Sequence, residues 1–163
     1  EAKNKKISEL NACVLKRERH DEIIEKLNKM NVNINYITDG DIAGALSVIG
    51  ENPKNDIYYS TGGAPEGVVV AAALSCYGGQ IQGRLVLNEE EKVRAKKLGI
   101  TDFNKKYNIE DMVNGDVIFC ATGVTSGDLA KGVIDLGNEF KVNTFALHKS
   151  RKIIKSVTNI YNK

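Results

Sequence analysis

The 163-residue sequence has no tryptophan, two prolines and three cysteines, and each scarcity excludes a class of protein. Six tyrosines and four phenylalanines, with no tryptophan, leave no aromatic stripe on which nucleic acid bases would stack. Three widely spaced cysteines among apolar neighbours are typical of reduced, buried thiols in a cytosolic protein. No apolar run approaches the roughly 20 residues of a membrane span, and no signal peptide opens the sequence. We therefore expect a cytoplasmic protein that binds neither nucleic acid nor membrane.

An excess of charge of one sign is also missing, because 23 basic and 21 acidic residues give a net charge of +2. The two signs are mixed along most of the chain. The densest charged stretch, residues 89–97, runs from acidic to basic, as favourable interaction with a helix dipole requires. The length suits one domain with a real core, and 42% hydrophobic residues are typical of a globular protein. We expect residues 1–163 to form a single α/β domain.

Hydrophobic periodicity predicts strands and helices that alternate along the chain. The expected strands are residues 11–15, 32–37, 56–60, 80–87 and 116–122, and the expected helices are residues 19–30, 42–49, 68–74 and 88–98. A closing hairpin of residues 143–148 and 153–157 would add antiparallel strands. The pattern therefore predicts a mixed, mainly parallel sheet flanked by helices. The loops that follow the first three strands would then meet at one edge, where open α/β sheets bind ligands.

The loop after the third expected strand, Thr61-Gly-Gly-Ala-Pro-Glu-Gly67, combines features of a phosphate site with features of a metal site. Gly62 and Gly63 let a ligand approach the main chain, and Pro65 suits the first helical position, beside free N–H groups that bind anions. Glu66 would repel a bound phosphate unless a divalent cation such as Mg²⁺ or Mn²⁺ lay between them. The alternative is that Glu66 only complements the helix dipole.

Charged side chains also follow the first and second expected strands. Lys16-Arg-Glu-Arg-His20 offers arginine geometry for a phosphate or phosphosugar, although such clusters are usually solvated turns. Asp39 and Asp41 suit hydrogen bonds to sugar hydroxyls or a metal, or else a turn with Asp41 as the helix cap. The glycine loop of residues 122–127 is interpreted as structural.

In this order, these stretches resemble the C-terminal half of the class II fructose-1,6-bisphosphatases. Five stretches that together span nearly the whole chain carry the resemblance: Lys16-Arg-Glu-Arg-His20, Ile37-Thr-Asp-Gly-Asp-Ile-Ala43, Gly62-Gly-Ala-Pro-Glu-Gly67, Gly78-Gly-Gln-Ile-Gln-Gly-Arg84 and Ala121-Thr-Gly-Val-Thr125. The resemblance implies the fold of the sugar phosphatases, shared with inositol monophosphatases, and a Mn²⁺ or Mg²⁺ cofactor. It also implies removal of the 1-phosphate of fructose 1,6-bisphosphate in gluconeogenesis, with sedoheptulose 1,7-bisphosphate as a substrate of some relatives.

The resemblance also assigns roles to individual residues. It implies that Glu66 is a metal ligand and that seven residues line the sugar bisphosphate site: Arg17, Glu18, Arg19, Asp39, Gly40, Asp41 and Gly63. The stretch at residues 17–19 commonly reads Lys-Pro-Arg in the family, so Arg19 is the position that keeps the family pattern.

The family's other acidic metal ligands and its Asp-Gly-Thr catalytic segment have no counterpart in these residues. We therefore expect the substrate side of the enzyme without its N-terminal metal-binding half, with little or no activity by itself. The full-length form is expected to be a homodimer or homotetramer. The alternative is a non-catalytic module that binds a phosphosugar or serves in assembly.

Overall fold

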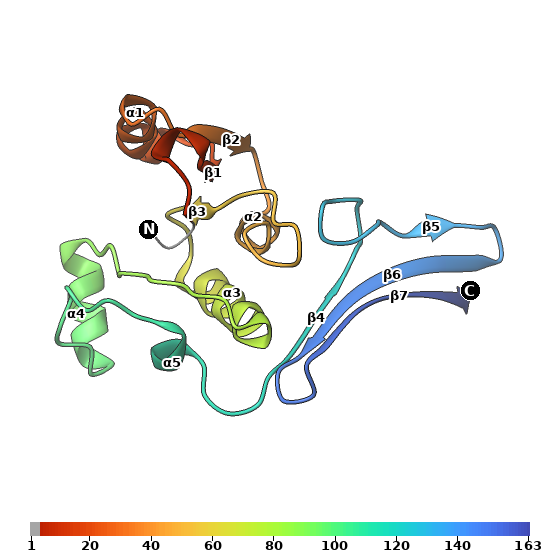
Figure 1. Ribbon diagram of the computed structural model, residues 1–163. Coiled ribbons are helices and arrows are strands. Elements are labelled where there is room, and N and C mark those ends of the chain that lie inside the picture. The colour runs from red at the N-terminus through yellow and green to blue at the C-terminus, as the bar shows by residue number, and fades with distance from the viewer. Residues whose placement is uncertain (1–3) are drawn as a thin grey trace.

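A three-stranded parallel sheet forms one part of the computed structural model, which describes residues 4–163 (Figure 1). Its strands are β1 (Asn11–Leu15), β2 (Asn33–Ile37) and β3 (Ile57–Tyr59), in the order β2-β1-β3. The central strand β1 pairs in parallel with both neighbours. Because helices cover both faces of a parallel sheet, the residues from Ala12 to Leu15 are all buried and apolar.

Two helices cover this sheet, α1 (Asp21–Lys29) and α2 (Asp41–Leu46), and a third, α3 (Ala64–Tyr77), lies beyond α2. Val14 of β1 packs in one cluster with Ile24 and Leu27 of α1. The opposite face of the sheet meets α2, whose Gly44 lies directly against the Tyr58 ring. α3 packs against α2, so α2 lies between the parallel sheet and the longest helix of the fold.

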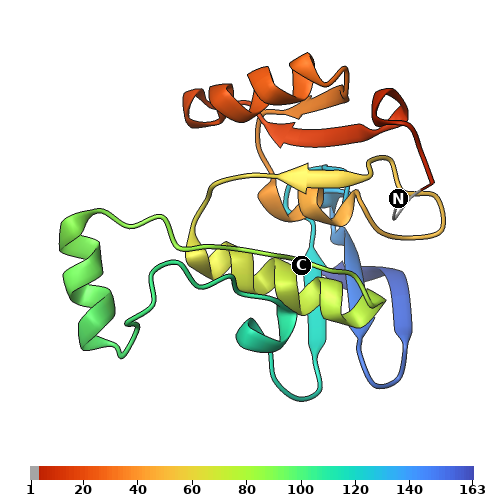
Figure 2. The same ribbon diagram turned by 60° about the vertical axis from the view of Figure 1, so that its left-hand side comes forward.

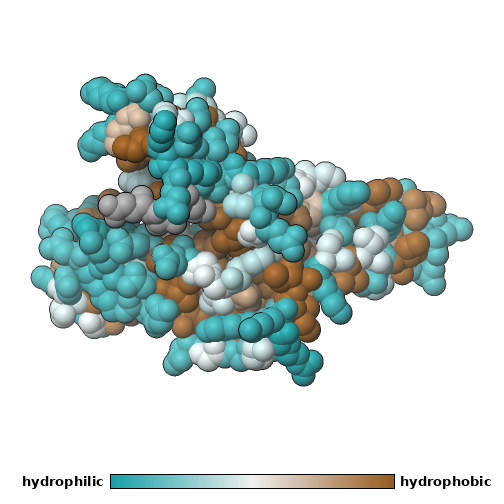
Figure 3. Space-filling model, in the orientation of Figure 1, coloured by the Kyte–Doolittle hydropathy of each residue, from teal (hydrophilic) through white to brown (hydrophobic). Residues whose placement is uncertain are grey.

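A second, antiparallel sheet lies on the other side of α3 (Figure 2). Its strands are β4 (Ile118–Thr122), β5 (Ile134–Asp135), β6 (Glu139–His148) and β7 (Ile153–Asn162). β6 pairs with all three others, and Phe119 and Leu147 join α2 and α3 in the larger hydrophobic core. β7 pairs with β6 along its whole length and is exposed from Ile154 to its end. Apolar side chains consequently reach the surface along the hairpin (Figure 3).

Short elements complete the described chain: η1 (Ile7–Glu9), η2 (Glu18–His20), α4 (Glu89–Lys97) and α5 (Ile109–Met112). α4 begins at a capping box, in which Asn88 Oδ1 accepts the Glu91 N–H at 2.9 Å and Glu91 Oε2 accepts the Asn88 N–H at 2.9 Å. Within residues 4–163, every helix is too short or too polar to cross a membrane.

The predicted α/β class is confirmed, as are the parallel arrangement of the first three strands and the closing hairpin. The prediction of one mixed sheet is wrong in detail, because the parallel and antiparallel strands form two separate sheets with α2 and α3 between them. Residues 80–87 are not a strand and make one isolated bridge, between Gly83 and Tyr107. Alternating apolar residues show that a segment can be extended, but they do not supply a neighbouring strand.

Candidate functional site

The loops that follow β1, β2 and β3 meet at the carboxyl edge of the parallel sheet, as the predicted topology requires. The β1 and β3 loops are joined through Thr61. Arg19 Nε donates to the Thr61 carbonyl oxygen at 2.7 Å, and the Thr61 N–H donates to His20 Nε2 at 2.8 Å. The basic stretch after β1 therefore holds the start of the glycine turn.

The β2 and β3 loops are joined through Asp41. Its Oδ1 accepts hydrogen bonds from the Tyr58 hydroxyl at 2.5 Å and from Ser60 Oγ at 2.7 Å. Tyr58 and Ser60 are two residues apart on an extended segment, so they share a face, and this spacing is the sequence signal for their common partner. A Cβ built on Gly62 would lie 3.8 Å from the Asp41 carboxylate oxygens, which places the glycine turn beside this carboxylate.

The hydrogen bonds at Asp41 also change its acidity and that of its partner. Burial raises the pKa of Asp41, but the hydrogen bonds from Tyr58 and Ser60, together with the positive charge of Arg19, hold it below the ordinary value of 3.8. Burial and the same bond to Asp41 raise the pKa of Tyr58 well above 10.0. Asp41 therefore stays ionised and Tyr58 stays protonated at neutral pH.

Gly40, rather than Asp41, is the N-cap of α2, so the predicted capping role of Asp41 is wrong. Gly40 has a φ of 85°, in the left-handed region that glycine tolerates best. Asp39 Oδ1 accepts the Gly40 N–H at 2.8 Å and stabilises this turn. Asp39 is otherwise exposed, whereas Asp41 points toward β3, so the two acidic residues of this loop have different surroundings.

The other predicted ligand-binding side chains, Arg17, Glu18 and Arg19, are exposed to solvent. Arg17 Nη1 donates to the neighbouring Lys16 carbonyl oxygen at 3.0 Å, a local contact that fixes nothing outside its own loop. Arg19 alone of these three reaches across to the glycine turn. Its terminal guanidinium nitrogens stay available for an anion, because Nε makes the contact with Thr61.

The glycine turn forms the start of α3. Gly63 is the N-cap. Pro65 was predicted to be the first residue of the helix, but it is the second, after Ala64. The exposed Glu66 side chain folds back over Gly63, so that a Cβ built there would lie 2.0 Å from Glu66 Oε2. A glycine at position 63 therefore leaves room for this carboxylate.

Glu66 is a suitable oxygen ligand for Mn²⁺ or Mg²⁺, but a metal site needs more donors. Residues 4–163 contain no group of three or more His, Cys, Asp or Glu side chains arranged to bind a metal. The carboxylate beside Gly62, that of Asp41, is already hydrogen-bonded to Tyr58 and Ser60. The described residues thus do not complete a metal site by themselves.

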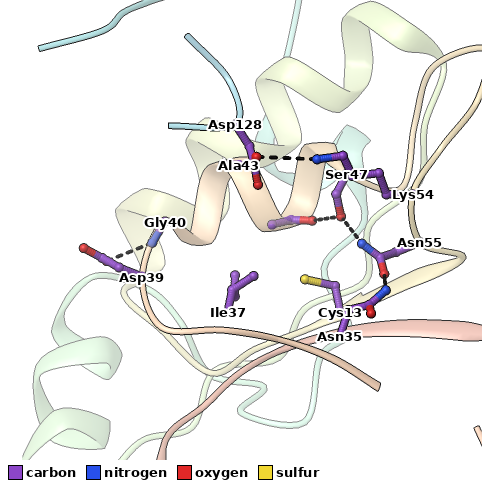
Figure 4. Close-up of a pocket in the computed structure, with 11 residues that line it drawn as sticks. Cys13, Asn35, Ile37, Asp39, Gly40, Ala43, Ser47, Lys54, Asn55 and Asp128 are labelled. Carbon is purple, nitrogen blue, oxygen red and sulfur yellow. Dashed lines mark hydrogen bonds and ion pairs between the residues drawn. The ribbon is translucent and has the colours of Figure 1, made fainter. Parts of the chain in front are cut away.

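A pocket of about 270 Å³ lies between α2 and β2 and reaches the β2 loop at Asp39 and Gly40 (Figure 4). Hydrogen bonds along its wall link Asn35 to Asn55 at 2.6 Å and Asn55 to Ser47 Oγ at 2.8 Å. The remaining predicted site residues do not line it: Arg17, Glu18, Arg19, Asp41, Gly63 and Glu66. The structure therefore separates this pocket from the contacts that join the three loops.

The family model described as bacterial fructose-1,6-bisphosphatase, glpX-encoded, matches residues 1–161. The chain belongs to this family. A D-fructose 1,6-bisphosphatase class 2/sedoheptulose 1,7-bisphosphatase of Synechococcus sp. (strain JA-3-3Ab) is 33% identical over 100% of the chain and 51% of that protein. A fructose-1,6-bisphosphatase class 2 of Haemophilus influenzae is 33% identical over 96% of the chain and 51% of its own length. A fructose-1,6-bisphosphatase 1 class 2 of Escherichia coli K12 is 33% identical over 98% of the chain and 52% of its length.

The chain therefore spans about half the length of the curated class 2 relatives that it matches. The resemblance inferred from the five sequence stretches is confirmed. In this chain, Arg19, Asp41 and the glycine turn lie together at one edge of the parallel sheet.

Proposed function

We propose that this chain forms the sugar-binding side of a fructose-1,6-bisphosphatase. The enzyme hydrolyses the 1-phosphate of fructose 1,6-bisphosphate to give fructose 6-phosphate and phosphate, a reaction of gluconeogenesis in the cytoplasm. Sedoheptulose 1,7-bisphosphate is the second proposed substrate, and a homodimer or homotetramer the proposed assembly. The observation that supports this function best is the meeting of the three loops in a chain that matches the family over residues 1–161.

Each loop has a separate part in binding the sugar bisphosphate. Arg19 uses Nε to hold the Thr61 carbonyl, which fixes the guanidinium plane and leaves two nitrogens to bind a phosphate. The outward oxygen of Asp39 accepts a hydrogen bond from a sugar hydroxyl. Gly62 and Gly63, which lack side chains, let the substrate approach the main chain at the start of α3.

We propose that Glu66 supplies one ligand to a Mn²⁺ or Mg²⁺ ion near the departing phosphate. The metal, when bound, would neutralise the negative charge of the phosphate. Without a metal, the Glu66 carboxylate would repel that phosphate. The remaining ligands would come from the part of the relatives that this chain does not span. The residues of this chain therefore bind and orient the sugar, whereas the hydrolytic step needs groups from elsewhere.

Calorimetric titration of fructose 1,6-bisphosphate into the chain, with Mn²⁺ present, tests the sugar-binding role. Arg19→Ala is expected to weaken binding roughly tenfold or more, because it removes a charge-assisted hydrogen bond to phosphate. Arg151→Ala, in the exposed turn between β6 and β7, is the matched control and should bind as the wild type does. Equal affinities for the wild type and Arg19→Ala would contradict the proposed role of Arg19.

A non-catalytic phosphosugar-binding module is the second candidate, favoured by the incomplete set of metal ligands within residues 4–163. Such a module would bind the sugar bisphosphate as described, but it would have no hydrolytic partner. Mixing the chain with the separately produced N-terminal half of the E. coli relative distinguishes the candidates. Metal-dependent phosphate release by the mixture, above that of either half, favours the enzyme.

A further inference from the structure

Thr61 is held at both sides of its backbone by two consecutive residues of the β1 loop. Its carbonyl oxygen accepts a hydrogen bond from Arg19 Nε at 2.7 Å, and its N–H donates to His20 Nε2 at 2.8 Å. Arg19 is exposed, but His20 has no exposed surface at all. The bond from Thr61 to His20 is therefore shielded from water, which would otherwise replace a lost partner.

The partners of His20 define which ring nitrogen carries its proton. Nδ1 lies 2.5 Å from the Leu15 carbonyl oxygen, which can only accept, so Nδ1 must be the protonated nitrogen. Nε2 is then unprotonated and accepts the Thr61 N–H. One tautomer of the neutral ring thus links the end of β1 to the turn that follows β3.

We infer that His20 is a positioning residue, which fixes the Gly62–Gly63 turn for the sugar bisphosphate by orienting the Thr61 peptide. This inference rests on the proposed function for its ligand. Two adjacent glycines have more backbone freedom than any other pair, so the turn needs a fixed point next to it. The Thr61 peptide precedes Gly62 directly, and His20 is itself held by the end of the central strand. Sites that bind with precision depend on such supporting contacts.

Three variants separate this role from simple filling of the core. His20→Gln places an amide oxygen near the position of Nε2 and can still accept the Thr61 N–H. His20→Asn places its amide near Nδ1 and can still donate to the Leu15 carbonyl, but it leaves the Thr61 N–H without an acceptor. Gln has nearly the volume of His, but Asn is one methylene smaller, so His20→Leu, which fills the site and cannot accept the Thr61 N–H, is the control for volume.

Hydrogen exchange of backbone amides, without ligand, is the first measurement. The positioning role predicts roughly tenfold faster exchange at Thr61, Gly62 and Gly63 in His20→Asn, with most of the protection restored in His20→Gln. Exchange that is as slow in His20→Asn and His20→Leu as in His20→Gln would overturn the inference, because loss of the acceptor would then have no effect.

Nitrogen NMR on the unaltered chain keeps the test valid if either variant fails to fold. We expect Nδ1 to be protonated, Nε2 to be bare, and a through-bond coupling between Nε2 and the Thr61 nitrogen. A protonated Nε2, or no such coupling, would overturn the inference.

Titration of fructose 1,6-bisphosphate with Mn²⁺ links the positioning role to the ligand. We expect about tenfold weaker binding by His20→Asn and near wild-type binding by His20→Gln. Undiminished binding by His20→Asn would show that the turn does not need this residue. If no form binds, including the wild type, the proposed function fails, and the exchange and NMR results still decide whether His20 fixes the turn.

Discussion

At the scale of single residues, Gly63 shows how a missing side chain shapes the candidate site. Its φ of −68° suits any residue, so the glycine is not required by the backbone. The position of the Glu66 carboxylate requires a glycine here, because a Cβ at position 63 would lie 2.0 Å from Glu66 Oε2. The flexible Glu66 side chain can swing away, but its carboxylate would then leave the start of α3.

We therefore predict that Gly63→Ala changes ligand binding far more than stability. Urea unfolding should show a change within about 0.5 kcal/mol, as at ordinary surface positions. Calorimetry should show weaker binding of fructose 1,6-bisphosphate in the presence of Mn²⁺. Gly67→Ala is the matched control, since a Cβ there meets nothing within 4 Å, and it should bind as the wild type does.

The contact between Asp41 and Tyr58 predicts how stability depends on pH. Because the pKa of Asp41 is lowered in the folded chain, its stabilising contribution is present above 3.8 and is lost as the pH falls through the folded pKa. Because the pKa of Tyr58 is raised, its contribution is present below 10.0 and is lost as the pH rises through the folded value.

Asp41→Asn should accordingly cost about 1–2 kcal/mol of unfolding free energy at pH 7 and progressively less below pH 3.8. Chemical denaturation at a series of pH values checks this prediction. Tyr58→Phe removes the hydroxyl donor, so adding Asp41→Asn to that variant should cost less than it does in the wild type. A penalty that is constant down to the lowest pH would contradict the prediction.

At the scale of elements, the packing of α2 on the parallel sheet depends on Gly44. A Cβ there would lie 2.6 Å from Ile37 Cδ1 and 2.7 Å from Tyr58 Cε2. The Tyr58 ring has little freedom to move, because its hydroxyl is bonded to Asp41. The glycine therefore sets how closely α2 approaches the sheet, and with it the position of the β2 loop.

Replacing a helical glycine by alanine ordinarily stabilises a helix by up to about 1 kcal/mol. We predict the opposite sign for Gly44→Ala, a loss of about 1–3 kcal/mol, since α2 would have to move away from the sheet. Thermal unfolding of Gly44→Ala, compared with that of Gly67→Ala, checks the predicted sign. Gly67 lies in α3 with open space around it, so its replacement should raise the melting temperature. A stabilised Gly44→Ala would show that α2 adapts without cost.

At the scale of the whole molecule, the three loops that we propose bind the sugar lie together, but the described residues do not complete a metal site. Among residues 4–163 no cluster of three potential ligands accompanies Glu66, and the chain spans about half of its relatives' length.

The chain also has an edge strand, β7, that is exposed from its second residue onward. Its single-domain organisation and the oligomeric state remain predictions.

We predict that the isolated chain releases little or no phosphate from fructose 1,6-bisphosphate, even with saturating Mn²⁺ or Mg²⁺. The Glu66 carboxylate alone is not enough to bind the metals that activate water and stabilise the departing phosphate. A colorimetric phosphate assay on the pure chain, with a Glu66→Gln variant in parallel, tests it. Appreciable release that disappears in Glu66→Gln would contradict the prediction and would show that the chain completes a metal site.

The sequence predicted the fold best where local patterns decide the structure. The strand Asn11–Leu15, the helix that starts after Asn88 and the glycine turn before α3 were all recognisable, because periodicity and turn chemistry are local effects. It failed at residues 80–87, where the extended segment has no adjacent strand, and at the separation of the two sheets. Strand pairing depends on residues far apart in the chain, which a local pattern does not specify.

The α/β class, the family and the approximate edge at which Arg19, Asp39 and Glu66 lie could be read from the sequence alone. Only the folded chain shows which of the predicted residues face solvent and which support them. Asp41 is held by Tyr58 and Ser60, and His20 Nε2 accepts the Thr61 N–H, through contacts between β3 or its loop and the loops of other strands. Such contacts form only when the parallel sheet brings its strand ends together, so their partners could not be known before the fold was.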